Sequence, residues 1–240
     1  MIKPKKVLAA RLLPILIILV LGYSGAADAA PIIDFAIGPP HPASASISYA
    51  GGANPLVGTD LFVYNVLGFD TPQNGGVQYQ VFGGDLDFTT GNFIGHNGNT
   101  WFFAGGGSIT LYGGVDLNNN GSLDTGDIPA GTLLFSGTFS NASVTAYGLS
   151  FKITGASFYD TKDDALTEFF GLPNTLYEGN LNIGFYATGL PPNSFFSVFE
   201  GSGDASNSPV PEPATMLLFG CGLVGIGFAA RKKFKGALGR

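Results

Sequence analysis

The chain has 240 residues, of which 45% are hydrophobic and 12% charged, and its formal net charge is −6 at pH 7. Nine of its eleven Lys and Arg residues lie near the two ends, so residues 30–209 carry Lys152 and Lys162 against fifteen acids, a charge of 2 − 15 = −13. This composition argues against nucleic acid as a partner, because no basic cluster exists that could displace counterions from phosphates.

The N-terminus has the organisation of a secretory signal peptide. Basic residues between Lys3 and Arg11 precede an apolar run over 12–21, and Ala27-Asp28-Ala29 forms a small-x-small cleavage site. We predict cleavage after Ala29, which makes residues 1–29 the signal peptide. An uncleaved anchor is the alternative, although the apolar run is short for a membrane span.

Residues 30–200 have the pattern of one all-β domain. Short runs of alternating apolar and polar residues are separated by Gly or Asn turns, and helical periodicity is nearly absent. We predict a single β-sandwich, of which a jelly roll is one form, with roughly ten strands. The predicted strands are 43–49, 60–67, 77–82, 85–89, 92–95, 100–104, 108–112, 132–139, 142–147, 150–158, 180–187 and 195–199.

We assign no catalytic residues in the predicted strands. Asp85 and Asp87 lie on one face of a strand, and we interpret them as a solvated face or as additional calcium ligands, because a glycosidase needs two acids across a cleft. The two histidines stand apart from each other, and no Gly-x-Ser-x-Gly motif is present. Trp101 is either an exposed sugar-stacking residue or, as we favour, a core residue.

The segment 116–127 has the spacing of a twelve-residue calcium loop. Gly121 stands at position six, where such a loop turns sharply. The segment resembles the loops of dockerins and EF-hands, which implies a structural Ca²⁺ ion. Predicted strands flank it in place of helices, and Asp127 replaces the long Glu of position twelve, so we expect weak binding, about 0.1–1 mM. A polar hairpin that binds no ion is the alternative. The predicted ligands are Asp116, Asn118, Asn120, Ser122, Asp124 and Asp127.

One short helix is predicted after the strand at 150–158. Thr161 to Asp164 have the character of an N-terminal cap with acids in the first turn, and Gly171 and Pro173 end the segment. The helix should pack over one end of the sandwich. Beyond residue 200, the segment 201–209 lacks large apolar residues, and we predict a flexible linker there.

The last 31 residues, 210–240, form a three-part tail. Val210-Pro211-Glu212-Pro213 opens it, an uncharged apolar run over 214–230 follows, and basic residues close it. The run gives about 26 Å of helix, the short end of a transmembrane span. The basic cluster beyond it should stay in the cytoplasm, which places the rest of the chain outside. The cluster consists of Arg231, Lys232, Lys233 and Lys235.

These residues resemble the PEP-CTERM sorting tail of bacterial exported proteins. The resemblance is carried by the residues 210–213, the apolar run and Arg231 to Lys233, and it covers the tail alone. It implies recognition by an exosortase, a membrane-embedded cysteine protease-transferase. An ordinary permanent single-pass anchor is the alternative.

We therefore expect an exported, non-enzymatic protein of the cell surface or of the extracellular biofilm matrix. Its expected partners are the exosortase, the membrane before processing, and extracellular polysaccharide. A carbohydrate-binding module that retains matrix polysaccharide is the alternative function. A secreted hydrolase is a third candidate, for which the sequence offers no convergent catalytic set.

Overall fold

The structure is a computed structural model that describes residues 29–148, 150–189, 193–198 and 201–211, together with Gly220, Gly222 and Leu223. Our predictions for most of the signal peptide, including Ala27, and for the tail beyond Pro211, including Arg231 to Lys233, lie outside the described residues. Within this described part, no helix is long and apolar enough to cross a membrane.

The described chain is one antiparallel sheet of eleven strands with the short helix α2, which confirms the all-β prediction. The elements are β1 (Ile32–Ile37), β2 (Ser46–Tyr49), β3 (Pro55–Phe69), β4 (Gln78–Asn97), β5 (Thr100–Phe103), β6 (Gly106–Val115), β7 (Ile128–Tyr147), β8 (Ser150–Lys162), α2 (Asp164–Phe169), β9 (Tyr177–Tyr186), β10 (Phe195–Val198) and β11 (Ser202–Pro209).

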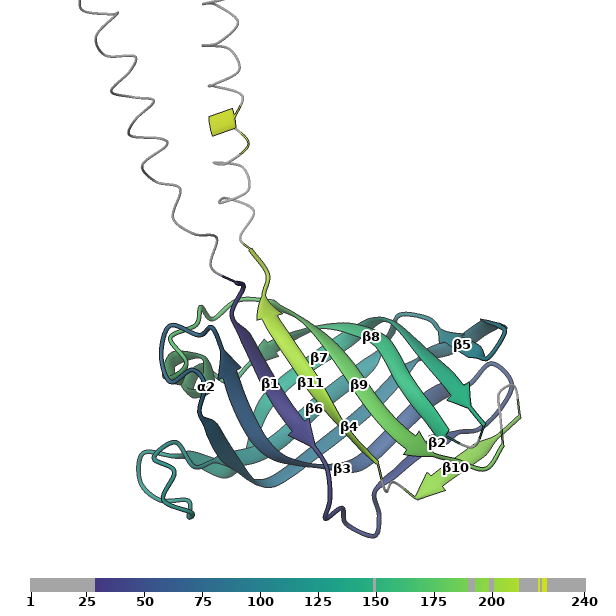
Figure 1. The fold of residues 1–240 in the computed structure, drawn as a ribbon, viewed down its shortest axis with the longest axis horizontal. Coiled ribbons are helices and arrows are strands. Elements are labelled where there is room, and N and C mark those ends of the chain that lie inside the picture. The colour runs from purple at the N-terminus through teal and green to yellow at the C-terminus, as the bar shows by residue number, and fades with distance from the viewer. Residues whose placement is uncertain are drawn as a thin grey trace, which may run out of the picture.

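The sheet closes on itself, as the strands that wrap around a common interior in Figure 1 show. The ring of hydrogen-bonded neighbours is β1, β3, β4, β6, β7, β8, β9 and β11, and β11 returns to β1. The expected sandwich would divide these strands between two sheets, whereas they belong to one. Long strands with repeated bulges explain the difference, because bulges bend a strand and let both of its edges find partners.

Several strands are longer than the sequence predicts, because glycines expected to form turns lie within strands. The predicted strands 77–82, 85–89 and 92–95 all fall in β4, apart from Val77, which precedes it. Gly83 has φ 59°, and the register of β4 against β6 shifts between Phe82 and Asp85. Glycine at a bulge adopts this conformation without a steric cost, so the strand continues where a turn was expected.

The sequence pattern does not predict two of the strands, β1 and β11. The segment 201–209, predicted as a flexible linker, instead forms β11, which is hydrogen-bonded on one edge to β1 and on the other to β9. Its residues are small and polar, but Ala205 and Asn207 alternate inward and are buried. Ladder bonds on both edges stabilise this strand in spite of its weak intrinsic propensity.

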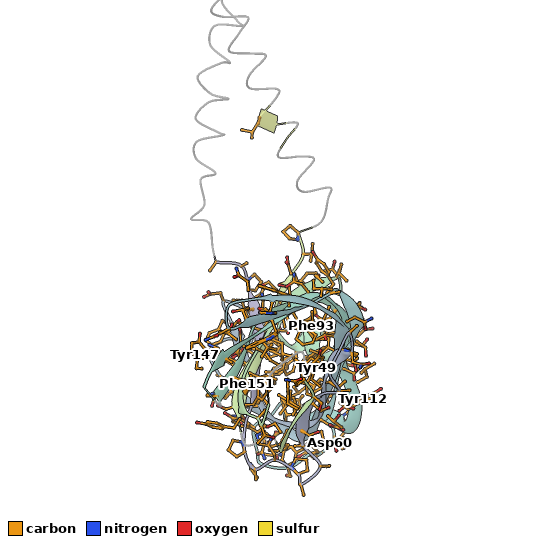
Figure 2. All side chains as sticks on the ribbon, turned by 90° about the vertical axis from the view of Figure 1, so that its right-hand side faces the viewer. Tyr49, Asp60, Phe93, Tyr112, Tyr147 and Phe151 are labelled. Atoms are coloured by element: carbon orange, nitrogen blue, oxygen red, sulfur yellow. The ribbon has the colours of Figure 1, made fainter. Side chains whose placement is uncertain are left out.

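The interior of the ring is filled by one cluster of buried side chains, most of them aromatic or branched aliphatic. Helix α2 covers one end of the ring, as predicted (Figure 1). Its N-cap Asp163 accepts hydrogen bonds from the N–H groups of Ala165 and Leu166. Phe169, the last residue of the helix, lies edge-on to Tyr79 of β4 with ring centroids 4.9 Å apart. The other end holds the rings of Tyr49, Phe93 and Phe151, seen within the sheet in Figure 2.

Candidate functional site

The sorting tail leaves the domain directly from a strand. β11 ends at Pro209, and the N–H of Val210 donates a 2.9 Å hydrogen bond to the carbonyl of Leu176. β1 begins beside it, since Ile33 pairs with Asn207. Both ends of the described domain therefore leave the ring at the same place (Figure 1). We call this end of the ring, which contains the beginning of β9 at Tyr177, the tail end, and the opposite end the distal end.

The predicted calcium loop lies at the tail end, between β6 and β7. Asp116 is fully buried, and its carboxylate accepts hydrogen bonds from the N–H groups of Asn120 at 3.2 Å and Gly121 at 2.6 Å. Gly121 has φ 89°, which fits the sharp turn expected at position six. The side chain of Leu123 packs against Gly114, which leaves no room there for a Cβ.

The remaining predicted ligands belong to the same hydrogen-bond network. Asp124 accepts amide hydrogen bonds from Asn118 at 3.1 Å and from Asn120 at 2.7 Å. Asn120 Oδ1 in turn accepts from the N–H and the hydroxyl of Ser122, each at 3.0 Å. Asp127 accepts from the N–H of Asp124 at 2.9 Å. The loop thus assembles hard oxygen donors suited to Ca²⁺, but the two amides must turn their oxygens inward before they can bind it.

A second group of carboxylates converges elsewhere on the ring. Oxygens of Asp60, Asp85 and Asp87 lie within 4.8 Å of one another on the outer face of β3 and β4. The N–H of Asp60 donates to Asp87 at 2.8 Å, whereas Asp85 Oδ1 is buried without a hydrogen-bond partner. Burial, then the charges of Asp87 and Asp60, raise the pKa of Asp85. Sequence spacing identified Asp85 and Asp87 as a pair, but only the pairing of β3 with β4 adds Asp60.

The core contains an ion pair that sequence reasoning missed. Lys162 Nζ lies 2.6 Å from Asp160 Oδ2, and both side chains are fully buried. Asn207 of β11 donates its amide to the other oxygen of Asp160 at 2.9 Å. Burial lowers the pKa of Lys162 to about 8, although Asp160 opposes this shift, and burial also raises the pKa of Asp160. Lys162 Nζ also faces the rings of Phe135, Tyr177 and Phe35, at 4.8, 4.9 and 5.6 Å from their centroids.

This ion pair had a weak signal in the sequence. Asp160 and Lys162 are two residues apart on a strand and therefore face the same side. The direction of that side, inward or outward, depends on the register of β8 within the ring. The sequence predicts Lys162 in the helix cap, whereas the structure places it at the end of β8.

Trp101 and the two histidines make contacts within the ring. Trp101 is 5% exposed and stacks on His96 with ring centroids 6.3 Å apart, so the core interpretation is confirmed. His41 contacts the backbone of two other segments, with Nε2 2.9 Å from the carbonyl of Gly201 and Nδ1 accepting from the N–H of Phe62. His41 thereby connects the segment before β2 to β3 and to the start of β11.

Comparison with known proteins identifies the tail. Residues 209–233 match the family model of the PEP-CTERM protein-sorting motif. This match supports export, sorting through an exosortase and a membrane-anchored C-terminal tail before processing. No curated protein matches the chain significantly. The same is true of solved structures.

Proposed function

We propose that this protein is a non-enzymatic component of the cell surface or extracellular matrix, delivered as a closed β domain and released from the membrane by an exosortase. The observation that carries this proposal is the sorting motif, which begins at Pro209, the last residue of β11. The acidic charge of the exported part, −13, suits a soluble and monodisperse domain outside the cell.

The position of the motif limits where the tail is cut. Because β11 pairs with β1 and β9 up to Asn207 and Pro209, cleavage before Pro209 would remove part of the ladder. Cleavage beyond Val210 leaves the ring intact, including the hydrogen bond to Leu176.

Mass spectrometry of the released protein tests this proposal. We expect an N-terminus at Ala30, or within a residue or two of it, and a C-terminus between Val210 and Pro213. A double substitution, Pro211→Ala with Pro213→Ala, should leave the full tail attached in the membrane fraction. A mature protein that stays in the membrane fraction and still ends at Arg240 would contradict processing by an exosortase and make the tail a permanent anchor.

We also propose that the loop 116–127 binds a structural Ca²⁺ ion. Support comes from the six oxygen-bearing residues at calcium-loop spacing and from the buried carboxylate of Asp116. An ion would replace the amide N–H groups of Asn118 and Asn120 that now donate hydrogen bonds to Asp124. Calcium would then brace the connection between β6 and β7 at the tail end.

Calcium should raise the melting temperature. For a dissociation constant near 1 mM, 10 mM CaCl₂ stabilises the folded state by about 1.4 kcal/mol, since only the folded state binds. That corresponds to an increase in melting temperature of roughly 3–6 °C for a domain of this size. Differential scanning calorimetry with and without calcium measures this shift. An NaCl solution of equal ionic strength serves as the control.

Two double variants separate the loop from the acidic cluster. Asp124→Asn with Asp127→Asn should abolish the shift, and Asp85→Asn with Asp87→Asn should preserve it. The reverse pattern would place the ion at Asp60, Asp85 and Asp87. No shift in the unsubstituted protein would leave the loop as a polar hairpin.

A further inference from the structure

The distal end of the ring carries the two most exposed aromatic side chains of the described chain. Tyr147 is 68% exposed and Tyr186 is 64% exposed, whereas the other exposed aromatics, at Tyr64, Phe69, Phe102, Tyr112 and Tyr159, range from 38% to 45%. Figure 2 shows Tyr147 at the outer edge of the ring. Exposed aromatic side chains that gather on one face are typical of contact surfaces, whereas single ones are common on any protein.

The strand register places these two tyrosines side by side on one face. Tyr147 of β7 is the partner of Ser150 in β8, and Ser150 is the partner of Tyr186 in β9. Directly paired residues point to the same face of a sheet, so both rings flank Ser150 on the outside. Two strand spacings separate their backbones by about 10 Å, a distance comparable to the length of a disaccharide.

The surface around Ser150, between and beside the two rings, carries small and polar residues. Lys152, exposed on β8, follows Ser150 on the same face and pairs with Gly184 of β9. A Cβ on Gly184 would meet no atom closer than 3.9 Å, so the glycine leaves open space beside the lysine. We call Tyr147, Ser150, Lys152, Gly184 and Tyr186 the tyrosine patch.

We propose that the tyrosine patch binds a neutral polysaccharide, with the two tyrosine rings stacking on the apolar faces of sugar rings two units apart. Tyr presents a large apolar face and a polar hydroxyl, which together match the two kinds of surface on a pyranose ring. Ser150 and Lys152 supply hydrogen bonds to sugar hydroxyls between the stacked units.

Charge and orientation select this occupant over others. The exported part carries −13, which repels anionic lipid and polyanions at the distances over which charges act. Lys162, the other lysine of that part, is buried, so the patch holds its exposed cation. β9 runs from the tail end at Tyr177 to the distal end at Tyr186, so the patch lies opposite the membrane tail, where it reaches extracellular polymer.

This inference rests on the proposed location outside the cell, but it is tested separately from tail processing. We would titrate the exported protein, held in a detergent micelle by its tail, with cellohexaose, laminarihexaose, chitohexaose and an acidic oligogalacturonate by calorimetry. At least one neutral hexaose should bind. Tyr147→Ala and Tyr186→Ala should each weaken that binding at least tenfold, without a change in melting temperature.

Tyr159→Ala is the matched control, because Tyr159 is also an exposed tyrosine of β8 but lies near the tail end, paired with Glu178. Its affinity should equal that of the unsubstituted protein. An equal loss of affinity in all three tyrosine variants would overturn the proposal. So would the absence of binding to every neutral hexaose at millimolar concentration. Dimers that disappear in Tyr147→Ala, measured by analytical ultracentrifugation, would reassign the patch to contact between two copies.

Discussion

A chain that ends at Gly201 will show no cooperative unfolding transition, whereas a chain that ends at Val210 will unfold in a single one. The shorter chain lacks β11, so β1 and β9 each lose one hydrogen-bonded edge and the ring opens. The loss of β11 also takes the buried Ala205 out of the core and removes the Asn207 amide that donates to the buried Asp160. An unpaired polar group in a core costs about 1–3 kcal/mol, in addition to the lost ladder. Thermal unfolding followed by circular dichroism compares the two chains.

A point substitution gives a milder test of the same strand. A Cβ on Gly203 of β11 would lie 2.0 Å from the carbonyl oxygen of Asn182, so Gly203→Ala must displace backbone and destabilise the domain. Gly184→Ala, on the facing strand β9, is the matched control, because open space surrounds it. A chain ending at Gly201 with an unchanged melting temperature, or equal effects of the two glycine substitutions, would restore the linker interpretation of 201–209.

Lys162→Met should destabilise the domain by about 3–5 kcal/mol, the usual cost of removing one partner of a buried ion pair. The substitution keeps the apolar length of the side chain but leaves the carboxylate of Asp160 buried with only the Asn207 amide beside it. The second substitution Asp160→Asn should recover most of the loss, because it removes the uncompensated charge. Urea denaturation measures all three proteins. A single substitution that costs less than its double counterpart would contradict this account.

The same lysine makes the free energy of unfolding depend on pH in the alkaline range. Burial lowers the pKa of Lys162 from 10.5 to about 8, so between these values the unfolded chain holds a proton that the folded protein has released. The free energy of unfolding should therefore rise as pH increases from about 8 towards 10. Burial raises the pKa of Tyr177 from 10.0 to about 12, which reverses the trend above pH 10. In Lys162→Met the rise should be absent and the fall should remain.

The all-β class and the short helix could be derived from the sequence because they depend on local patterns. Alternation in Val77 to Phe82 predicts a strand and its two faces, and Tyr79 and Val81 are indeed buried while Gln78 and Gln80 are exposed. Asp163 and Gly171 bound the helix as expected, since a cap bond and a positive φ are properties of the adjoining backbone.

The closed ring and its sites were decided by contacts between distant segments. The composition of 201–209 predicts a linker, and only the ladders to β1 and β9 make it a strand. The calcium-loop spacing could be found locally, but Asp60 reaches Asp85 and Asp87 through the pairing of β3 with β4. Asn207 likewise reaches Asp160 across 47 positions.

By itself, the sequence determined the sorting signal at 209–233, the −13 charge of the exported part and the strand pattern, because each is a property of composition or of neighbouring residues. The tertiary structure alone decided that Lys162 is buried, that Trp101 is unavailable to sugar, and that Tyr147 and Tyr186 share one outer face. The alternation of residues along a strand defines its two faces but not which of them points inward. The closure of the ring determines which face is buried.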